Sequence, residues 1–588
     1  MNKVLAIAYM LGILLISLSL SLSLIRRVTT TSVLHSSSKN NDIKQLSSTE
    51  KSNYDGNVKP IILKELKNNN DDDNKNKNDN KNNDGGVEIA LEIYNRALDT
   101  IEDVSIHIKR AFNPFYQNST RTILDYENRI DNRPRIVIVG SGWASHAFLK
   151  TIETDIFHVI CVSPRPFFLF TPMLTGTCVG SVEYRSIVEP IRSSNPFVDY
   201  LEGEVIGNNT QQHNIYNILT LFLDIDKKNK KIIAKLPKVQ GSERQALLNF
   251  KVGYDHLVVA CGVQSSDFGL AGVSKYTHYL KEISDSKAIK QNILDCFELA
   301  TIPETDDAEV ERLLTFVAVG GGPTGVEFIG ELTDFVTQDV GRLYPRLKSK
   351  VKIVIVNSSP SLLSTFDKNL QEIALQKLTT SGVTIILNAR VIEVSDGSLK
   401  YKIKSNDPNN NDENEIRFGV CVWAAGTASK PLIKTISSAF GENQNEYFVK
   451  NGGKLAVDGY YRVLDDDVNE RGTNFALGDC SYCIENESCP QTAQVAAQQG
   501  AYLARLFNRE YNFADSIPSI KKNMFDLDPL KFSYLYLRNI TNARPFKFIN
   551  LGTLAYIGES EAVAKVQIGD SGVSVTSSGY SAFLLWYA

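Results

Sequence analysis

The chain has 588 residues, which is too long for one ordinary domain and suits two or three, each with its own hydrophobic core. It carries 63 Lys and Arg against 67 Asp and Glu, a formal net charge of −4. It therefore lacks the overall basic field that nucleic-acid-binding proteins use, and we expect no nucleic-acid partner.

Eight cysteines are scattered between Cys161 and Cys489 without the spacing of a disulfide framework, which favours a reducing compartment. Cys480, Cys483 and Cys489 are close enough in sequence to suggest a metal site. However, no second pair completes a set of four ligands, and no histidine is nearby. We interpret them as loop cysteines and expect no metal.

The N-terminal region is expected to target or anchor the chain. Val4 to Ile25 is apolar and, at about 20 residues, long enough to cross a bilayer, so 1–35 is predicted to be an apolar targeting or anchor segment. The Arg- and Ser-containing stretch that follows favours a mitochondrial presequence. Residues 36–132 are predicted to be a low-complexity tether and extension, since their Asn/Asp/Lys runs bury too little apolar surface to offset ordering entropy.

From about residue 133, apolar strands and helical segments alternate, as in a parallel α/β sheet. Two segments, RIVIVGSGWASHAFLK at 135 and LTFVAVGGGPTGVEFIGEL at 314, combine a strand, a glycine turn and a helix. Such a turn lets helix N-terminal N–H groups bind a pyrophosphate, although it also occurs in purely structural roles. The second motif supplies Gly320, Gly322 and Gly325. The first supplies Gly140 and Gly142, with Ser145 replacing the third glycine. Two such folds in one chain predict a flavin facing a nicotinamide.

Three later segments are expected to complete these domains. YDHLVVACG and FGVCVWAAGT end in glycine turns at Gly262 and Gly426, where the chain would cross between domains; the alternative is an ordinary buried strand. NFALGDC contains Gly478 and Asp479, and this carboxylate could accept a hydrogen bond from a ribityl hydroxyl. A helix follows in which Gln494 and Gln498 share one face. That face could instead be solvated or packed between helices.

These residues resemble the type II NADH dehydrogenases, or alternative NADH:quinone oxidoreductases, of the pyridine nucleotide-disulfide oxidoreductase superfamily. The similarity runs from about 133 to 588 and includes GSGWAS, SPRPFFLFTPML, EYRSIVEPIR, HYLKEI, VGGGPTGVEFIGEL, FALGD, QTAQVAAQQG and LGTLAYIG. It implies an α/β fold like that of glutathione reductase, with two Rossmann-type dinucleotide-binding domains, the second inserted in the first. The expected parts are 133–300 and 431–510 for the FAD-binding domain, 301–430 for the NAD(P)H-binding domain, and 511–588 for a C-terminal membrane-facing portion.

The resemblance also implies roles for individual residues. FAD would be held by Gly140, Gly142, Ser163, Arg165, Thr171 and Asp479. Gly320, Gly322, Gly325 and Glu327 belong to the NADH side, with Glu327 near the nicotinamide, and Gln494 and Gln498 lie where a quinone would approach.

The implied reaction passes a hydride from NADH to FAD and two electrons to ubiquinone or a related quinone, without ion pumping. Residues 143–177 contain one cysteine, Cys161, so the dithiol relay of the disulfide reductases is excluded. The implied partners are the quinone and a membrane surface. The implied location is the mitochondrial inner membrane, with a homodimer as an open expectation.

Two departures from the family pattern matter. Asn357 follows the strand VKIVIV, where NADH-specific members usually have a glutamate that binds the ribose and repels the 2′-phosphate of NADPH. We therefore expect NADPH to be tolerated alongside NADH, and Asn357→Glu to sharpen the preference for NADH. The sequence also stops at Ala588, inside an apolar stretch that in family members usually continues into an amphipathic helix. Either the sequence is truncated there, which we expect, or the N-terminal apolar segment provides the membrane attachment instead.

Two other functions fit the same motifs. One is a soluble NAD(P)H reductase of an iron–sulfur protein, against which the TAQVAAQQG helix argues. The other is a redox-sensing flavoprotein that binds NADH without significant turnover. Steady-state NADH oxidation with a short-chain ubiquinone separates the sensor from the enzyme.

Overall fold

The protein is represented by a computed structural model. It describes residues 81–112, 133–205, 225–226, 231–235, 249–404, 413–467, 470–486, 489–520, 535, 538, 540–567 and 574–582. The predicted anchor segment 1–35 lies outside the described residues. Within the predicted extension, α2 (Lys81–Phe112) is helical, which its Ala-, Leu- and Glu-containing C-terminal part favours. No described helix is long and apolar enough to span a bilayer.

The first sheet is parallel, with the strand order β22-β10-β1-β2-β5. Its strands are β1 (Arg135–Val139), β2 (His158–Ser163), β5 (Asp199–Glu202), β10 (His256–Val259) and β22 (Asn474–Ala476). The strand β1 is buried at all five positions. Such an apolar run is expected where helices cover both faces of a parallel sheet.

The second sheet is also parallel and has the order β12-β19-β13-β14-β15. Its strands are β12 (His278–Tyr279), β13 (Thr315–Val319), β14 (Lys352–Val356), β15 (Thr384–Ile386) and β19 (Val420–Trp423). All five precede β22 of the first sheet in the chain. Parallel β-α-β arrangements thus occur twice, which confirms the predicted α/β class.

The main helices of the two sheets are α3 (Trp143–Thr151), α7 (Ile283–Ala300), α9 (Pro323–Phe335), α11 (Lys368–Thr380) and α14 (Ala493–Asn508). Helices α3 and α14 pack very closely. A Cβ on Gly500 of α14 would lie 2.0 Å from the carbonyl oxygen of Ala144 in α3. Only glycine permits this approach, which brings the two helix N-terminal regions to one edge of the first sheet.

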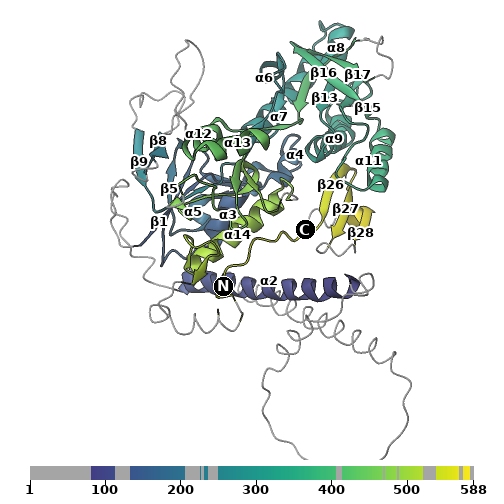
Figure 1. Cartoon of the computed structure of the whole chain (residues 1–588). Coiled ribbons are helices and arrows are strands. Elements are labelled where there is room, and N and C mark those ends of the chain that lie inside the picture. Colours follow the sequence, from purple (N-terminus) through teal and green to yellow (C-terminus); the bar gives the residue numbers. More distant parts are fainter. Residues whose placement is uncertain are drawn as a thin grey trace, which may run out of the picture. The chain divides into compact units, whose positions relative to one another are not determined.

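A C-terminal antiparallel sheet packs against α9 (Figure 1). It consists of β26 (Thr553–Gly558), β27 (Glu561–Gln567) and β28 (Ser574–Gly579). Gly330 of α9 faces Gly558, since a Cβ on Gly330 would lie 2.8 Å from the Gly558 nitrogen. This contact joins the C-terminal strands to the helix of the second glycine motif.

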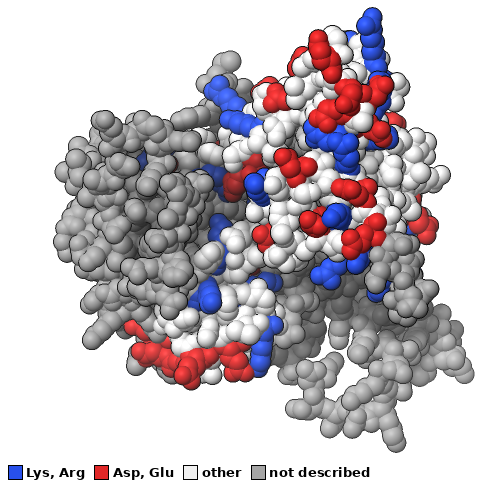
Figure 2. Space-filling view, turned by 90° about the horizontal axis from the view of Figure 1, so that it is seen from above, with Lys and Arg blue, Asp and Glu red and all other residues white. Residues whose placement is uncertain are grey.

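The remaining described elements are short or peripheral. The short strands are β3 (Phe167–Leu169), β4 (Val188–Pro190), β6 (Glu204–Val205), β7 (Ile225–Asp226), β8 (Lys231–Lys235), β9 (Asn249–Gly253), β11 (Val263–Ser265), β16 (Ala389–Ser395), β17 (Ser398–Ile403), β18 (Glu413–Arg417), β20 (Thr427–Ser429), β21 (Leu455–Val457), β23 (Ser481–Cys483), β24 (Tyr511–Asn512) and β25 (Ser519–Ile520). The short helices are η2 (Thr171–Met173), α4 (Leu174–Thr177), η3 (Tyr184–Ile187), α5 (Ile191–Ser194), α6 (Val273–Tyr276), α8 (Asp307–Leu313), η4 (Val336–Val340), α10 (Gly341–Leu343), η5 (Lys348–Lys350), α12 (Pro431–Ala439), α13 (Glu442–Lys450) and η7 (Gly478–Cys480). Figure 2 shows acidic and basic side chains interspersed on one face, without a continuous basic stripe there.

Candidate active site

A cavity of about 990 Å3 lies at the C-terminal edge of the first sheet. The turn after β1, the ends of β2, β10 and β22, and the start of α14 line it. The cavity is also lined by the β12–α7 turn, by β11, by the β20–α12 segment, by residues of the 169–175 segment, and by two residues of α9, Thr324 and Glu327. Ligands of open parallel sheets bind at this edge, so the position and size indicate a cofactor site.

The first glycine turn is shaped for close approach of the backbone. Gly140 has φ +117°, and a Cβ there would lie 2.4 Å from the Ala260 carbonyl oxygen. Gly142, at the N-cap of α3, faces open space instead, because no atom lies within 4 Å of an added Cβ. A helix N-terminus with an open glycine fits the pyrophosphate of a dinucleotide.

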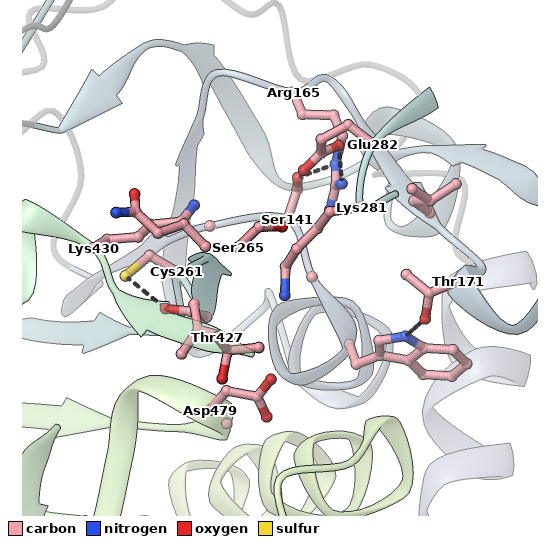
Figure 3. A pocket seen from close by; sticks show the side chains of 18 of the residues that line it. Ser141, Arg165, Thr171, Cys261, Ser265, Lys281, Glu282, Thr427, Lys430 and Asp479 are labelled. Carbon is pink, nitrogen blue, oxygen red and sulfur yellow. Dashed lines mark hydrogen bonds and ion pairs between the residues drawn. The ribbon is translucent and has the colours of Figure 1, made fainter. Parts of the chain in front are cut away.

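Beside this turn, polar side chains are fixed by one another. The Ser163 hydroxyl donates to Ser141 Oγ at 3.0 Å, and Arg165 Nε lies 3.3 Å from the same oxygen. Arg165 also forms an ion pair with Glu282 at 2.6 Å, which joins the end of β2 to the start of α7 (Figure 3). Thr171 Oγ1 accepts a hydrogen bond from Trp143 Nε1 at 3.0 Å. All these side chains are therefore held in place before a ligand binds.

Asp479 shares the cavity with a cation. Figure 3 shows Asp479 and Lys281 directed into the same space. Burial raises the pKa of Asp479, and the charges of Lys281 and Lys454 oppose that shift. Burial lowers the pKa of Lys281, which Asp479 counteracts. A carboxylate at this position can accept hydrogen bonds from ligand hydroxyls, while the lysine attracts negative charge.

The floor of the cavity contains a buried polar group that needs a partner. Thr175 in α4 lines the cavity and is 2% exposed, and its hydroxyl has no hydrogen-bond partner among the described residues. Unpartnered buried hydroxyls are rare because they are costly. Together with the glycine turn, this hydroxyl fits a site that a polar cofactor completes. Glu327, 8% exposed, lines the same cavity from α9.

The second glycine motif forms the strand, turn and helix that the sequence predicts, and Asn357 adds a support to the turn. Gly325 lies against Gly320, since a Cβ on Gly325 would be 2.0 Å from the Gly320 carbonyl oxygen. Gly322 is open, with nothing within 4 Å of an added Cβ. Asn357 Oδ1 accepts a hydrogen bond from the Gly321 N–H at 3.0 Å, and Nδ2 donates to Ser361 O at 2.9 Å. The Asn357 side chain thus holds the turn itself.

The two helix glutamines hold a backbone segment. Gln498 Nε2 donates to the Ile549 carbonyl at 2.8 Å, and the Ile549 N–H donates to Gln498 Oε1 at 3.1 Å. The Leu551 N–H donates to Gln494 Oε1 at 3.4 Å. Neither glutamine lines the cavity, whereas Gln491 does and donates to the Asp479 carbonyl at 2.9 Å.

The structure brings one group of the residues predicted from sequence to the cavity wall: Gly140, Gly142, Ser163, Arg165, Thr171, Gly262, Glu327, Gly478 and Asp479. A second group lies outside the lining: Ser145, Gly320, Gly322, Gly325, Asn357, Gly426, Gln494 and Gln498. Ser145 is fully buried, and a Cβ on Gly426 would meet the Phe268 ring at 2.2 Å. In this second group, Asn357 holds the turn of the second motif, and Gln494 and Gln498 bind the backbone at Leu551 and Ile549.

The cysteines form no metal site among the described residues. Cys480 and Cys483 are buried, and Cys489 is partly buried. Cys480 Sγ lies 3.2 Å from the Leu477 carbonyl oxygen, as in an ordinary packed thiol. Cys480 ends the short helix η7 and Cys483 ends strand β23, so these two cysteines lie in short elements and not in a loop.

Residues 134–500 match the family described as pyridine nucleotide-disulphide oxidoreductase. The chain belongs to this family. Within it, the chain is 32% identical to the mitochondrial external NADH-ubiquinone oxidoreductase 2 of Saccharomyces cerevisiae, over 77% of this chain and 76% of the relative. It is also 32% identical to the internal alternative NAD(P)H-ubiquinone oxidoreductase A1 of Arabidopsis thaliana, over 77% and 79%. These matches confirm the resemblance found in the sequence motifs.

A similar solved structure supports the fold. The NDH2 from Plasmodium falciparum in complex with NADH has a TM-score of 0.62 and 24% identity. The match covers 77% of this chain and 93% of that chain.

Sequence reasoning missed several residues of the cavity. Lys281, Glu282 and Lys430 line it, as does Thr175. The HYLKEI motif contains the first two, but a short strand followed by a helix gives no sign that its turn reaches the first sheet. The unpartnered state of Thr175 depends on tertiary packing and has no sequence signal.

Proposed function

We propose that the protein is a non-proton-pumping NADH:quinone oxidoreductase, which oxidises NADH and reduces ubiquinone or a related quinone with FAD as its resident cofactor. One observation carries this proposal: the first glycine turn, Asp479 and Glu327 line the same cavity, and Glu327 belongs to the helix of the second glycine motif. Relatives that are named NADH-ubiquinone and NAD(P)H-ubiquinone oxidoreductases support it.

FAD would be held chiefly by the first glycine motif. The α3 N-terminus, with Gly140 and Gly142, would bind the pyrophosphate, and Arg165 and Ser163 would fix its surroundings. Asp479 would accept hydrogen bonds from ribityl hydroxyls, and Thr171 would help to hold the flavin. When bound, FAD supplies the exchange of two electrons between a hydride donor and a quinone. The protein contributes alignment and the exclusion of water.

The second motif would hold the nicotinamide nucleotide. Gly320, Gly322 and Gly325 shape the turn at the N-terminus of α9, where the pyrophosphate would bind. Glu327, one helical turn into α9, would lie near the nicotinamide at the cavity wall. NADH is the proposed donor, and Asn357 provides no carboxylate to repel the 2′-phosphate of NADPH.

The domain bounds, the membrane-facing portion, the quinone side, the location and the oligomeric state are part of the same proposal. The strand order, in which β22 joins the first sheet after the second sheet, supports an NAD(P)H-binding domain inserted between two FAD-binding parts. The proposed bounds are 133–300 and 431–510 for FAD and 301–430 for NAD(P)H, and β12 (His278–Tyr279) of the second sheet lies before the boundary at 301. The 511–588 portion would face the membrane, and Gln494 and Gln498 would border the quinone through the segment that they hold. The mitochondrial relatives support the mitochondrial inner membrane as the location; a homodimer is an additional proposal.

Absorption spectra and turnover test this function. Purified protein should carry a flavin spectrum that NADH bleaches without oxygen and that added short-chain ubiquinone restores. Colourless protein that takes up no FAD would reject the proposal. Bleaching with turnover well below about 1 s⁻¹ would instead favour the redox sensor. Efficient reduction of a ferredoxin but not of quinone would favour the soluble reductase.

A further inference from the structure

Two cysteines from distant parts of the chain meet at one edge of the first sheet. Strands β10 and β22 are parallel neighbours, with Val259 in register with Ala476. Cys261 lies shortly after β10, and Cys480 ends η7, which follows β22. The Leu477 N–H donates to the Val259 carbonyl oxygen at 2.9 Å, so the two segments stay together beyond the strands. Both cysteines therefore lie at the carboxyl edge, where ligands of parallel sheets bind.

The side chains of these two cysteines face each other. They are close enough for a hydrogen bond in which the Cys480 thiol donates to the Cys261 sulfur. The Cys480 sulfur also lies 3.6 Å from the Val259 carbonyl oxygen, on the strand that leads to Cys261. Both residues are free cysteines. A disulfide requires two cysteines whose side chains point towards each other, and this pair meets that requirement.

The two thiols differ in their access to small molecules. Cys261 is partly buried and is among the residues that line the cavity (Figure 3). Cys480 is 1% exposed and does not line the cavity. A small oxidant that enters the cavity therefore meets Cys261 first, and Cys480 lies behind it.

Cys261 is also the thiol whose surroundings favour the reactive thiolate. The hydrogen bond from Cys480 lowers the pKa of Cys261, burial opposes this effect, and the positive charge of Lys430 supports it. The structure describes all eight cysteines, and in the other seven the pKa is raised, with burial as one cause in each. Thiols with a lowered pKa, an accessible sulfur and a second cysteine nearby are those that oxidise selectively.

We propose that Cys261 and Cys480 are a modification site, at which hydrogen peroxide converts the two thiols into a disulfide at the cavity wall. Cys261 is the residue that peroxide attacks, and Cys480 is the residue that closes the disulfide. This chemistry needs no bound cofactor and no quinone. The proposal therefore goes beyond the proposed function and does not depend on it.

The reaction has two steps. The Cys261 thiolate attacks one peroxide oxygen, the O–O bond breaks, and the leaving hydroxide takes up the proton that the thiol released, which gives a sulfenic acid and water. The Cys480 sulfur then attacks the Cys261 sulfur, the S–S bond forms, and the sulfenic oxygen leaves as water with the Cys480 proton. The balance is 2 Cys–SH + H₂O₂ → Cys–S–S–Cys + 2 H₂O. The two sulfurs lose the electron pair that the peroxide gains.

The disulfide should affect the cofactor site because each cysteine adjoins a residue of the cavity wall. Gly262 follows Cys261, Asp479 precedes Cys480, and both line the cavity. Bonded sulfurs lie closer together than hydrogen-bonded ones, so these two segments must shift when the bond forms. Oxidised protein should therefore hold FAD less tightly than reduced protein. This consequence, unlike the disulfide itself, rests on the proposed function.

The test is peroxide treatment of the full-length holoprotein after reduction with dithiothreitol and removal of the reductant. Remaining thiols are alkylated at intervals, and peptides are identified by mass spectrometry. We expect a peptide pair joined through Cys261 and Cys480, and its disappearance when dithiothreitol is added again. Cys261 should be oxidised at least about tenfold faster than any cysteine outside the pair.

Three variants assign the roles of the individual thiols. Cys480→Ser should leave Cys261 as a sulfenic acid, which dimedone labels and mass spectrometry detects. Cys261→Ser should leave Cys480 reduced, because the buried thiol is not attacked directly. Cys489→Ser is the matched control, since Cys489 is also partly buried, and it should form the disulfide at the wild-type rate.

The wild-type protein alone can overturn the proposal. Peroxide-treated protein in which Cys261 and Cys480 stay reduced, or in which Cys483 and Cys489 are joined instead, would do so. A Cys261–Cys480 disulfide in protein that takes up no FAD would support this proposal and reject the proposed function. In the holoprotein, oxidised samples should lose more FAD than reduced samples during gel filtration, and equal losses would overturn the expected effect on the cofactor site.

Discussion

The side-chain oxygen of Asn357 accepts a hydrogen bond from the Gly321 N–H at 3.0 Å, so the end of β14 holds the turn of the second glycine motif. Its amide nitrogen donates to the carbonyl oxygens of Ser359 at 3.3 Å and Ser361 at 2.9 Å. Both ends of the amide are therefore used inside the protein. A carboxylate could replace the acceptor but not the two donor interactions.

We predict that the wild-type protein accepts NADPH as well as NADH. No negative charge at position 357 repels a 2′-phosphate. The ratio of kcat/KM for NADH to that for NADPH should therefore be below about a hundredfold, or roughly 2.7 kcal/mol. Steady-state kinetics with both donors and one quinone measure it. A larger ratio would show that other residues exclude the phosphate.

Asn357→Glu should increase the preference for NADH and destabilise the protein. The new charge disfavours NADPH, while the carbonyls of Ser359 and Ser361 lose their donor. Unpaired buried acceptors cost about 1–3 kcal/mol, and the cost here should be smaller because Ser359 and Ser361 are partly exposed. The kinetic ratio and the free energy of unfolding should change together. Asn357→Gln is the matched control, since glutamine has the length of glutamate but keeps an amide donor and carries no negative charge.

The sequence predicted the parts of the site that depend on local backbone shape. The strand, glycine turn and helix at Gly140 and at Gly320 are recognisable because only a few residues can form such turns. The roles of Asn357 and Gln498 were not predictable in the same way. Both side chains bind backbone groups that lie several or many residues away, and a polar residue at a strand end or helix face is compatible with either a ligand or a structural contact.

Contacts between segments that are far apart in the chain were not predicted from the sequence either. The antiparallel sheet β26–β28 packs on α9 because Gly330 and Gly558 permit close contact, and neither glycine stands out in the sequence. Lys281 reaches the cavity because the β12–α7 turn lies beside the first sheet. Such contacts between distant segments depend on how the domains pack, which a single sequence does not reveal.

Alanine substitutions at two glycines of the FAD-binding region should have different effects, one on folding and the other on FAD binding. Gly500→Ala would place Cβ 2.0 Å from the Ala144 carbonyl oxygen, so α3 and α14 must separate, and we expect a large loss of soluble folded protein. Gly142→Ala meets no protein atom within 4 Å and should fold. Its methyl group would instead enter the space proposed for the pyrophosphate. We expect its retention of FAD during purification to fall, measured by flavin absorbance per protein.

Different measurements report the two expected effects, the loss of folding in Gly500→Ala and the loss of FAD in Gly142→Ala. Circular dichroism and melting temperature report the folded state, and flavin content reports the ligand site. A Gly142→Ala protein that binds FAD normally would contradict the proposed pyrophosphate position. A stable Gly500→Ala protein would contradict the tight α3–α14 contact.

Gln498→Ala should act through the C-terminal segment. The glutamine makes two hydrogen bonds with the backbone of Ile549, so its loss should lower the free energy of unfolding by about 1–3 kcal/mol. The KM for quinone should rise, while reduction of FAD by NADH stays unchanged. Gln491→Ala is a suitable comparison because Gln491 contacts the Asp479 backbone at the cavity, and its loss should affect FAD retention first. A raised quinone KM without loss of stability would mean that Gln498 contacts the quinone directly.

Glu331 should make the stability of the protein depend on pH. Glu331 lies in α9 and is 6% exposed. Burial raises its pKa from 4.5 to about 6, so between these pH values the folded state binds more protons than the unfolded state. Stability from this group is fully present below about pH 4.5 and is lost as pH rises through about 6. A shift of about 1.5 units corresponds to about 2 kcal/mol.

Glu331→Gln removes this pH dependence because glutamine does not ionise. Relative to wild type, the variant should therefore gain about 2 kcal/mol in free energy of unfolding between pH 4.5 and pH 7.5. Denaturant titrations of both proteins at the two pH values measure the difference, and Glu393→Gln, at an exposed position, should show little change. If the difference is the same at both pH values, Glu331 is ionised with an ordinary pKa. The carboxyl group would then not hold a proton near neutral pH.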